Sequence, residues 1–238
     1  GHKIGHDKHK YRKKIEKLFH LESNHPERGA PMIRYLTCLI TSAPLAPGFP
    51  VNLNLPSWID LHLHSTASDG ELAPVDLVAA VAAAGVKVMA LTDHDSVAGL
   101  DSAREACAQH GLQLVNGVEI SCRHDALDVH IVGLGVDPAD PVLTEKLAEQ
   151  MTRRAARAQV ISARLQKEGI PDLLASASAA APQGIPARPH FARALVACGI
   201  CKDEKDAFSK YLALGKPAYV KMDWPGVAEA IDWITAAG

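Results

Sequence analysis

The segment Asp60-Leu61-His62-Leu63-His64-Ser65 is the most informative part of the sequence for the fold. Together with Ile59, its two leucines alternate with polar residues, which is the period-two pattern of a β-strand. The two histidines stand two positions apart, so both project from the same face of that strand. We therefore expect a strand whose carboxyl end carries two histidines side by side.

Strand and helix patterns alternate after this first strand. Pro74 opens a predicted helix that ends before Gly85, and Ser96 can cap a second helix that runs to His110. Further apolar runs predict strands over 86–91, 112–118 and 127–134. Strands that alternate with helices at this spacing predict βαβ units, hence an α/β protein with a parallel sheet or barrel.

In the later half of the chain, the spacing of apolar residues is typical of helices. Asp140 and Pro141 begin a long amphipathic helix that ends near Gly169, and helical stretches follow over 191–197 and 204–214. We expect residues 139–217 to form a helical insertion that caps the barrel. Residues 57–138 and 218–238 are then the partial barrel itself.

Residues 1–56 differ from the rest, and the segment 1–34 is rich in Lys, Arg and His. His2, His6 and His9 could share one helical face, but no fixed set of further metal ligands lies near them. We interpret residues 1–56 as an extension, a tag or a disordered tail, with Met32 as a candidate start.

Composition restricts the class of protein further. A chain of 238 residues with 47% hydrophobic content can bury a real core, and a net charge of −2 argues against a general nucleic-acid coat protein. Five cysteines, an odd number, are not a disulfide framework and favour the reducing cytoplasm. No apolar run is long enough for a bilayer. We expect a cytoplasmic protein with no membrane and no stable protein partner.

Acidic and imidazole side chains recur at the predicted strand ends. They are His62 and His64, then Asp69 in the following loop, Asp93 and His94, Glu119, and His130 within the fourth strand. The carboxyl ends of parallel strands face the active site in barrels and open α/β sheets. A single such histidine is usually a hydrogen-bonded structural residue, but four successive strand ends would each need a separate buried partner. Four imidazoles with carboxylates suit Zn, Mn or Fe better than Mg or Ca alone.

Several motifs resemble one known family, the PHP (polymerase and histidinol phosphatase) superfamily. They are Asp60-Leu61-His62-Leu63-His64-Ser65, Ser68-Asp69-Gly70, Leu91-Thr92-Asp93-His94-Asp95 and Gly117-Val118-Glu119-Ile120-Ser121. Two later motifs resemble its branch of 3',5'-nucleoside bisphosphate phosphatases, some of which trim RNA from the 5' end: Arg188-Pro189-His190-Phe191-Ala192-Arg193-Ala194-Leu195 and Lys216-Pro217-Ala218-Tyr219-Val220. The resemblance implies a distorted (β/α)7 barrel that binds divalent metals.

The resemblance also assigns roles to residues. The implied metal ligands, for two to three Mn, Zn or Fe ions, are His62, His64, Asp69, His94, Glu119 and His130. Asp93 and His94 are the implied catalytic residues, with Asp93 orienting a ligand or the attacking water. The candidates for binding a second phosphate are Arg154, Arg157, Arg188 and His190. The alternatives are a solvated helix face for the two helix arginines and a metal-ligand role for His190.

The implied activity is hydrolysis of the 3'-phosphate of nucleoside 3',5'-bisphosphates, with trimming of short RNA as a second substrate class. The family pattern continues beyond Gly238 with further ligands, so we expect a C-terminally incomplete barrel. One alternative is therefore a catalytically incomplete fragment that binds metal or nucleotide without turnover. Another is a histidinol-phosphatase-like enzyme. An amidohydrolase-type deaminase or lactonase would need a metal-bridging lysine, whereas Glu119 and His130 stand at these positions.

Overall fold

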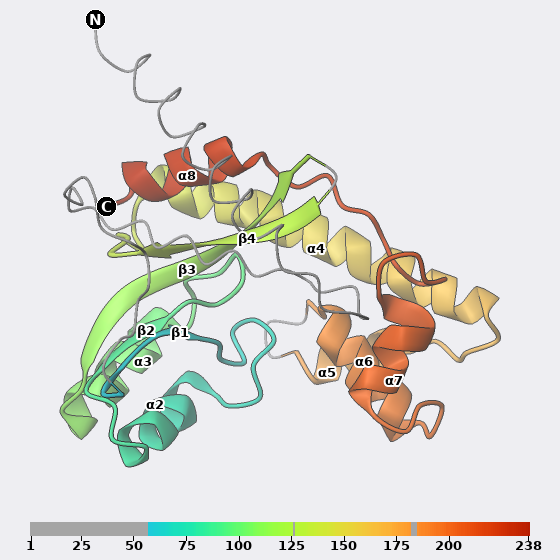
Figure 1. The fold of residues 1–238 in the computed structure, drawn as a ribbon, viewed down its shortest axis with the longest axis horizontal. Helices are drawn as coiled ribbons and strands as arrows, with labels where there is room; N and C mark the ends of the chain where they lie inside the picture. The colour runs from blue at the N-terminus through green and yellow to red at the C-terminus, as the bar shows by residue number, and fades with distance from the viewer. Residues whose placement is uncertain (1–56, 126, 182–184) are drawn as a thin grey trace, which may run out of the picture. The chain divides into compact units, whose positions relative to one another are not determined.

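The computed structural model describes residues 57–125, 127–181 and 185–238, which form a mixed α/β structure (Figure 1). Its sheet has the order β1-β2-β3-β4. The strands are β1 (Ile59–Leu63), β2 (Val88–Leu91), β3 (Gln113–His124) and β4 (Leu127–Leu134). The predictions made for residues 1–56 lie outside the described part of the chain.

The first three strands are parallel and are connected by α2 (Pro74–Ala83) and α3 (Leu100–His110). Both helices end as the sequence predicts, because Gly85 and Gly111 follow them with positive φ angles of 88° and 67°. The start of α3 was predicted too early. The Ser96 hydroxyl accepts the backbone N–H of Ala98 at 3.2 Å in a turn that precedes the helix. The predicted βαβ units are confirmed.

The expectation that the fourth strand is parallel is wrong. β4 runs antiparallel to β3, with Glu119 opposite Val132 and Ser121 opposite His130. The two strands are separated by a short hairpin connection in which Asp125 has a φ of 52°. A parallel pair needs a crossover of a dozen residues or more, and this connection is too short for one.

The long predicted helix is confirmed as α4 (Pro141–Lys167). Its start is fixed by Pro141 in the first turn and by the Asp140 carboxylate, which accepts the backbone N–H of Leu143 at 2.7 Å. Four short helical elements follow before residue 217: α5 (Leu174–Ala179), α6 (Arg188–Ala197), α7 (Glu204–Ala207) and the π-helix η1 (Phe208–Leu212). The described part of 139–217 contains no strand.

Besides a small cluster of Ala90, Val132 and Leu134 in the sheet, two larger hydrophobic clusters hold the described elements together. One joins α2, β2 and α3 around Met89, Leu91 and Leu100. The other joins the carboxyl half of α4 to the short helices around Ile161, Phe191 and Leu195. The last helix, α8 (Val227–Ala236), packs against β3, β4 and α4. Within the described residues, no helix is both long and apolar enough to cross a bilayer.

Candidate metal centre

The carboxyl end of β1 is fixed beside the carboxyl end of β2. Thr92, the first residue after β2, donates its backbone N–H to the Leu63 carbonyl at 2.8 Å and its hydroxyl to the same oxygen at 3.1 Å. His64 therefore leaves the sheet next to the segment that carries His94. His62, two residues earlier, projects on the same side of β1.

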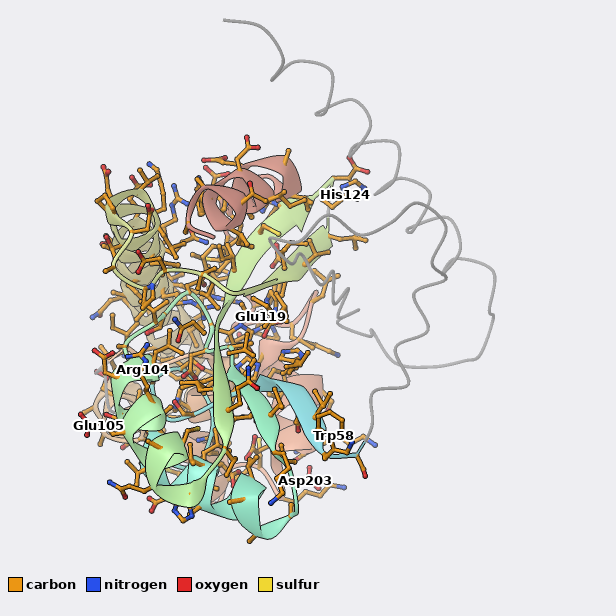
Figure 2. All side chains as sticks on the ribbon, turned by 90° about the vertical axis from the view of Figure 1, so that its left-hand side faces the viewer. Trp58, Arg104, Glu105, Glu119, His124 and Asp203 are labelled. Atoms are coloured by element: carbon orange, nitrogen blue, oxygen red, sulfur yellow. The ribbon has the colours of Figure 1, made fainter. Side chains whose placement is uncertain are left out.

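Glu119 comes from the middle of β3, not from its end as the sequence suggested, whereas His124 ends that strand (Figure 2). β3 extends past the end of β2 because it continues its pairing with β4. The overhang pairs with the loop after β2. Glu119 donates its N–H to the Asp93 carbonyl at 3.1 Å and accepts the N–H of Asp95 at 2.9 Å. This parallel bridge places His94 directly beside Glu119.

Three donor atoms meet at one point of this edge. The Nε2 atoms of His62 and His64 each lie 2.9 Å from Oε2 of Glu119 and 3.1 Å from one another. If both nitrogens were N–H donors to that oxygen, their hydrogens would stand roughly 2 Å apart, inside van der Waals contact. Lone pairs arranged around a cation carry no such crowding.

The separations also fit a transition-metal ion. Ligands at about 2.0–2.1 Å from one ion, at tetrahedral or octahedral angles, are about 2.8–3.4 Å apart. The three contacts of 2.9, 2.9 and 3.1 Å lie in that range. His62, His64 and Glu119 therefore form a set that could hold a metal ion.

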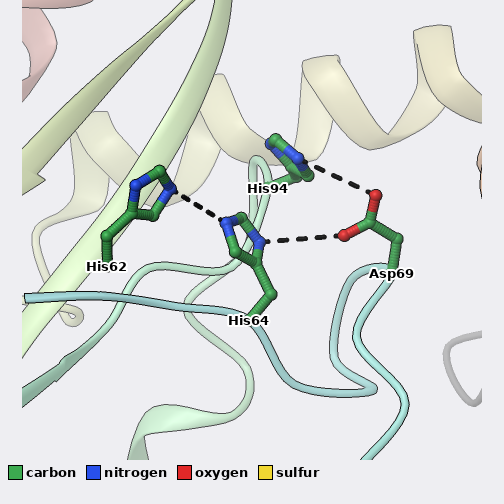
Figure 3. A pocket seen from close by; sticks show the side chains of 4 residues that line it. All are labelled: His62, His64, Asp69 and His94. Carbon is green, nitrogen blue, oxygen red and sulfur yellow. Dashed lines mark hydrogen bonds and ion pairs between the residues drawn. The ribbon is translucent and has the colours of Figure 1, made fainter. Parts of the chain in front are cut away.

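Two further sets overlap the first. Asp69 faces His64 Nδ1 at 3.7 Å and His94 Nε2 at 3.8 Å, as Figure 3 shows. On the other side, Oε1 of Glu119 lies 3.2 Å from His130 Nδ1, and its Oε2 lies 3.5 Å from His94 Nδ1. The second set is thus His64, Asp69 and His94, and the third is His94, Glu119 and His130. Glu119 belongs to two of the three sets.

The electrostatics of the cluster suit cation binding. Burial alone would raise the pKa of Glu119, but the imidazoles of His130, His62 and His64 close to its carboxylate hold that pKa well below its ordinary value. Burial, reinforced by neighbouring His130, lowers the pKa of His94 well below its usual range. Its Nδ1 atom is buried with no hydrogen-bond partner among the described residues. A charged carboxylate beside a neutral imidazole with an unused nitrogen is a donor set for a metal.

Burial acts differently on His64. By itself burial would lower its pKa, but the hydrogen bond and negative charge of Glu119, with Asp69 and Asp93, raise the pKa above its ordinary value. His64 therefore experiences the concentrated negative potential of the site. An open pocket at this point is lined by His62, His64, Asp69 and His94.

Asp93 supports the loop that carries Asp69. Its carboxylate accepts the Ser65 backbone N–H at 2.8 Å, the Ser65 hydroxyl at 2.7 Å and the Ser68 hydroxyl at 2.6 Å. Burial raises the pKa of Asp93 although all three hydrogen bonds oppose that rise. Gly70 closes the loop against the His64 carbonyl, where a Cβ would clash. The described contacts of the Asp93 carboxylate go to this loop.

The predicted phosphate-binding residues come from α4 and α6. The apolar stripe of α4 is interrupted by Gln150 and Arg157, which are buried, and by Arg154. Arg154 lines a small pocket next to Asp69 and His94. Arg157 is buried, and its Nε and Nη2 atoms have no hydrogen-bond partner among the described residues. The solvated-face alternative is therefore wrong for Arg157.

Charges of both signs act on Arg157, because Asp128 and Tyr219 oppose the effect of the neighbouring arginines. Burial, together with the charges of Arg188 and Arg154, lowers its pKa to about 9, which still leaves it protonated at neutral pH. On α6, His190 is fully buried, and its Nδ1 accepts the backbone N–H of Ala187 at 2.9 Å. Its Nε2 is buried with no partner in the described structure. Burial and neighbouring Arg193 lower the pKa of His190.

Two residues of this region were not singled out from the sequence. Asp95 binds Arg154, 59 positions away, and Arg193 on α6 donates Nη2 to the Asp69 carbonyl at 2.7 Å across 124 positions. Both lie within the motifs that carry the family resemblance. No role was predicted for them because their partners are far away in the sequence, and the spacing of neighbouring residues does not indicate such contacts.

Comparisons with known proteins place this geometry in a family. The PHP domain profile matches residues 60–235. The chain is 45% identical over 179 residues to the 5'-3' exoribonuclease of Haemophilus influenzae, covering 75% of this chain and 65% of that protein. It is 43% identical over 182 residues to the 3',5'-nucleoside bisphosphate phosphatase of Chromobacterium violaceum, covering 76% and 64%.

A solved structure shows the same fold. An amidohydrolase from Chromobacterium violaceum, crystallised with bound SO4 and no metal, has a TM-score of 0.74 and 42% identity. The alignment covers 76% of this chain and 64% of that one. The chain thus spans less than two thirds of the length of these relatives.

Proposed function

The chain belongs to the PHP domain family, and from that premise we propose that it is a metal-dependent phosphoesterase acting on nucleoside 3',5'-bisphosphates. The observation that carries the proposal is the set of three overlapping ligand groups that share Glu119, His64 and His94. Such overlap is what a cluster of ions a few ångströms apart requires. Both relatives are named for cleavage of phosphoesters of nucleotides.

We assign six residues of the cluster as metal ligands. They are His62, His64, Asp69, His94, Glu119 and His130, for two to three ions of Mn, Zn or Fe. When bound, such ions lower the pKa of a water molecule and stabilise charge on the phosphoryl oxygens. Glu119, with both oxygens facing histidines, would supply ligand atoms to more than one ion. Asp93 acts as a positioning residue that keeps the Asp69 loop in place.

The cationic residues of α4 and α6 supply the second half of the site. We propose that Arg154, Arg157, Arg188 and His190 bind a phosphate that is not being cleaved. Nε and Nη2 of the buried Arg157 have no hydrogen-bond partner among the described residues, and a phosphate dianion would offset the cost of burying that charge with charge-assisted hydrogen bonds. The SO4 ion in the related Chromobacterium structure agrees with anion binding in this fold.

The separation of the proposed metal ligands from the proposed phosphate ligands supports a domain assignment. We propose that 57–138 and 218–238, as part of a distorted (β/α)7 barrel, hold the metals, and that the helical insertion 139–217 recognises the nucleotide. A substrate with phosphates at both the 3' and 5' positions would contact both halves. Short RNA with a 5'-phosphate presents the same two groups, so it is the second substrate class to test.

The proposal is tested by phosphate release from adenosine 3',5'-bisphosphate in the presence of Mn²⁺. We expect release by this chain, loss of release in His62→Ala, and unchanged release in the exposed-surface control Asp101→Asn. A short 5'-phosphorylated RNA is assayed in parallel. If the wild-type chain releases phosphate from both substrates no faster than His62→Ala does, the proposal that it is an enzyme is wrong. Metal and nucleotide binding without release would then favour the alternative of a binding protein.

A further inference from the structure

Asp95 stands at the junction of the metal ligands and the helical insertion. It follows His94 in the chain, its side chain is fully buried, and its backbone has a φ of 51°, in the left-handed region. Its N–H donates to the Glu119 carbonyl at 2.9 Å. A non-glycine residue with this conformation is held there by its surroundings, and such residues concentrate at functional sites.

The carboxylate of Asp95 contacts both β3 and α4, and Oδ1 accepts Nε2 of Gln150 on α4 at 3.4 Å. Oδ1 accepts the backbone N–H of Ser121 on β3 at 2.8 Å. Oδ2 accepts Nε of Arg154 at 2.7 Å and lies 2.6 Å from its Nη2. Asp95 therefore bonds to two backbone groups of β3, the Glu119 carbonyl and the Ser121 N–H. Its carboxylate also binds the Arg154 side chain of α4.

Arg154 is constrained on more than one side. Its Nη2 also donates to the Ser121 hydroxyl at 2.7 Å, and its guanidinium lies 5.4 Å from the centre of the Trp224 ring. The same side chain lines the small pocket that contains Asp69 and His94. With Nε and both N–H groups of Nη2 engaged, the two N–H groups of Nη1 are left for a group in that pocket.

We propose that Asp95 is a positioning residue that fixes the Arg154 guanidinium relative to the metal ligands, and so sets the spacing between the metal centre and the bound anion. This inference rests on the proposed function, because it takes Arg154 as a phosphate ligand. Asp95 can set that spacing because one residue is tied to His94 through the chain, to Glu119 through its backbone and to Arg154 through its carboxylate.

A purely structural ion pair is the competing explanation. Ser121 and Gln150, whose Nε2 donates to the Ser121 carbonyl at 2.8 Å, already connect α4 to β3 without the arginine. A buried ion pair is in general no more stable than apolar side chains of the same volume. A pair retained between two elements that are already joined, at the edge of the metal pocket, is better explained by orientation of the arginine.

The test is a double-mutant cycle read by phosphate affinity. The dissociation constants of inorganic phosphate and of Mn²⁺ are measured by calorimetry on the full chain, phosphate being titrated into Mn-loaded protein. We expect Asp95→Asn to weaken phosphate binding about tenfold, as Arg154→Ala does. The double variant Asp95→Asn/Arg154→Ala should be no weaker than Arg154→Ala alone, while Mn²⁺ affinity stays within about twofold of the wild type.

The control is the exposed pair Asp101–Arg104 on α3, where Asp101→Asn should leave both affinities unchanged. Additive losses in the double variant, or an Asp95→Asn variant that binds phosphate as the wild type does, would overturn the inference. A structural role would instead lower the thermal unfolding midpoint of Asp95→Asn without singling out phosphate affinity.

Two further measurements keep the outcome decisive. If Asp95→Asn does not fold, Asp95→Glu keeps the charge but displaces the carboxylate that holds Arg154. Phosphate affinity unchanged in Asp95→Glu then contradicts the inference, and a severalfold loss supports it. Wild-type protein that binds Mn²⁺ but no phosphate refutes the proposed function and this inference together, whereas wild-type binding with no effect of either variant refutes only the inference.

Discussion

Arg157 is the residue at which function and stability are most clearly opposed. Its guanidinium is buried on α4, and Nε and Nη2 have no hydrogen-bond partner among the described residues. Replacing a buried charge that lacks a partner with an apolar side chain commonly stabilises a fold. We predict that Arg157→Met raises the free energy of unfolding of the ligand-free protein by about 1 kcal/mol or more.

The same substitution should reduce phosphate affinity of the Mn-loaded protein by at least about tenfold. Urea unfolding and phosphate calorimetry measure the two effects. Arg153→Met, on the same helix but half-exposed and paired with Glu149, is the matched control and should change neither quantity. A destabilised Arg157→Met with normal phosphate affinity would show that Arg157 has a structural role instead.

Residue types at strand ends were visible in the sequence, but their side-chain partners were not. The alternation around His62 and His64 and the acidic or imidazole residues after later strands predicted the cluster that the structure brings together. The roles of Asp95 and Arg193 were not predicted, because each acts on a partner in another element. Hydrogen bonds over such separations follow from tertiary packing, which no local pattern encodes.

At the scale of elements, α6 of the helical insertion is joined to the metal-side loop by Arg193. Nη2 donates to the Asp69 carbonyl, and Nε lies 3.6 Å from a carboxylate oxygen of Glu204. A lost hydrogen bond from a charged donor costs about 1.5–3 kcal/mol. We predict that Arg193→Ala increases amide hydrogen exchange over residues 66–70 and weakens Mn²⁺ binding at Asp69 by about tenfold.

Hydrogen exchange with mass spectrometry and a Mn²⁺ titration test this coupling. Arg104→Ala, an exposed arginine on α3, provides the control. Exchange over residues 66–70 that is the same in Arg193→Ala and wild type would mean that Asp93 and Gly70 hold the loop without help from α6.

The sequence predicted the positions of helices and strands better than the direction in which the strands pair. Apolar runs and glycine stops gave the helices α2 and α4 nearly to the residue, because caps and stops are local features. The direction of β4 was missed because it depends on the length of the connection after β3, and β3 itself continues five residues past Glu119. That extension moved Glu119 from the end of a strand to its middle without removing it from the site.

At the scale of the whole molecule, the proposed metal ligands lie on the strands and the loops that follow them, and the proposed phosphate ligands lie on α4 and α6. His64 and His94 follow strands of the sheet, whereas Arg154 and Arg157 belong to α4. A substrate analogue that contacts both should stabilise them together. We predict that Mn²⁺ and phosphate added together raise the thermal unfolding midpoint by more than the sum of their separate effects.

Differential scanning calorimetry of the four conditions measures this coupling. Arg157→Met should keep the shift caused by Mn²⁺ and lose the additional shift caused by phosphate. Strictly additive shifts in the wild type would argue that the two halves bind their ligands independently.

The most direct test of the proposed metal centre is the number of Mn²⁺ or Zn²⁺ ions that the purified chain retains after equilibrium dialysis. Glu119 is shared by two of the three ligand sets, so its loss should affect more than one ion. We predict about two to three ions per wild-type chain and a loss of at least one in Glu119→Gln, with Glu105→Gln on the exposed face of α3 unchanged. Equal metal content in wild type and Glu119→Gln would contradict the proposal that Glu119 and the surrounding histidines form a metal centre.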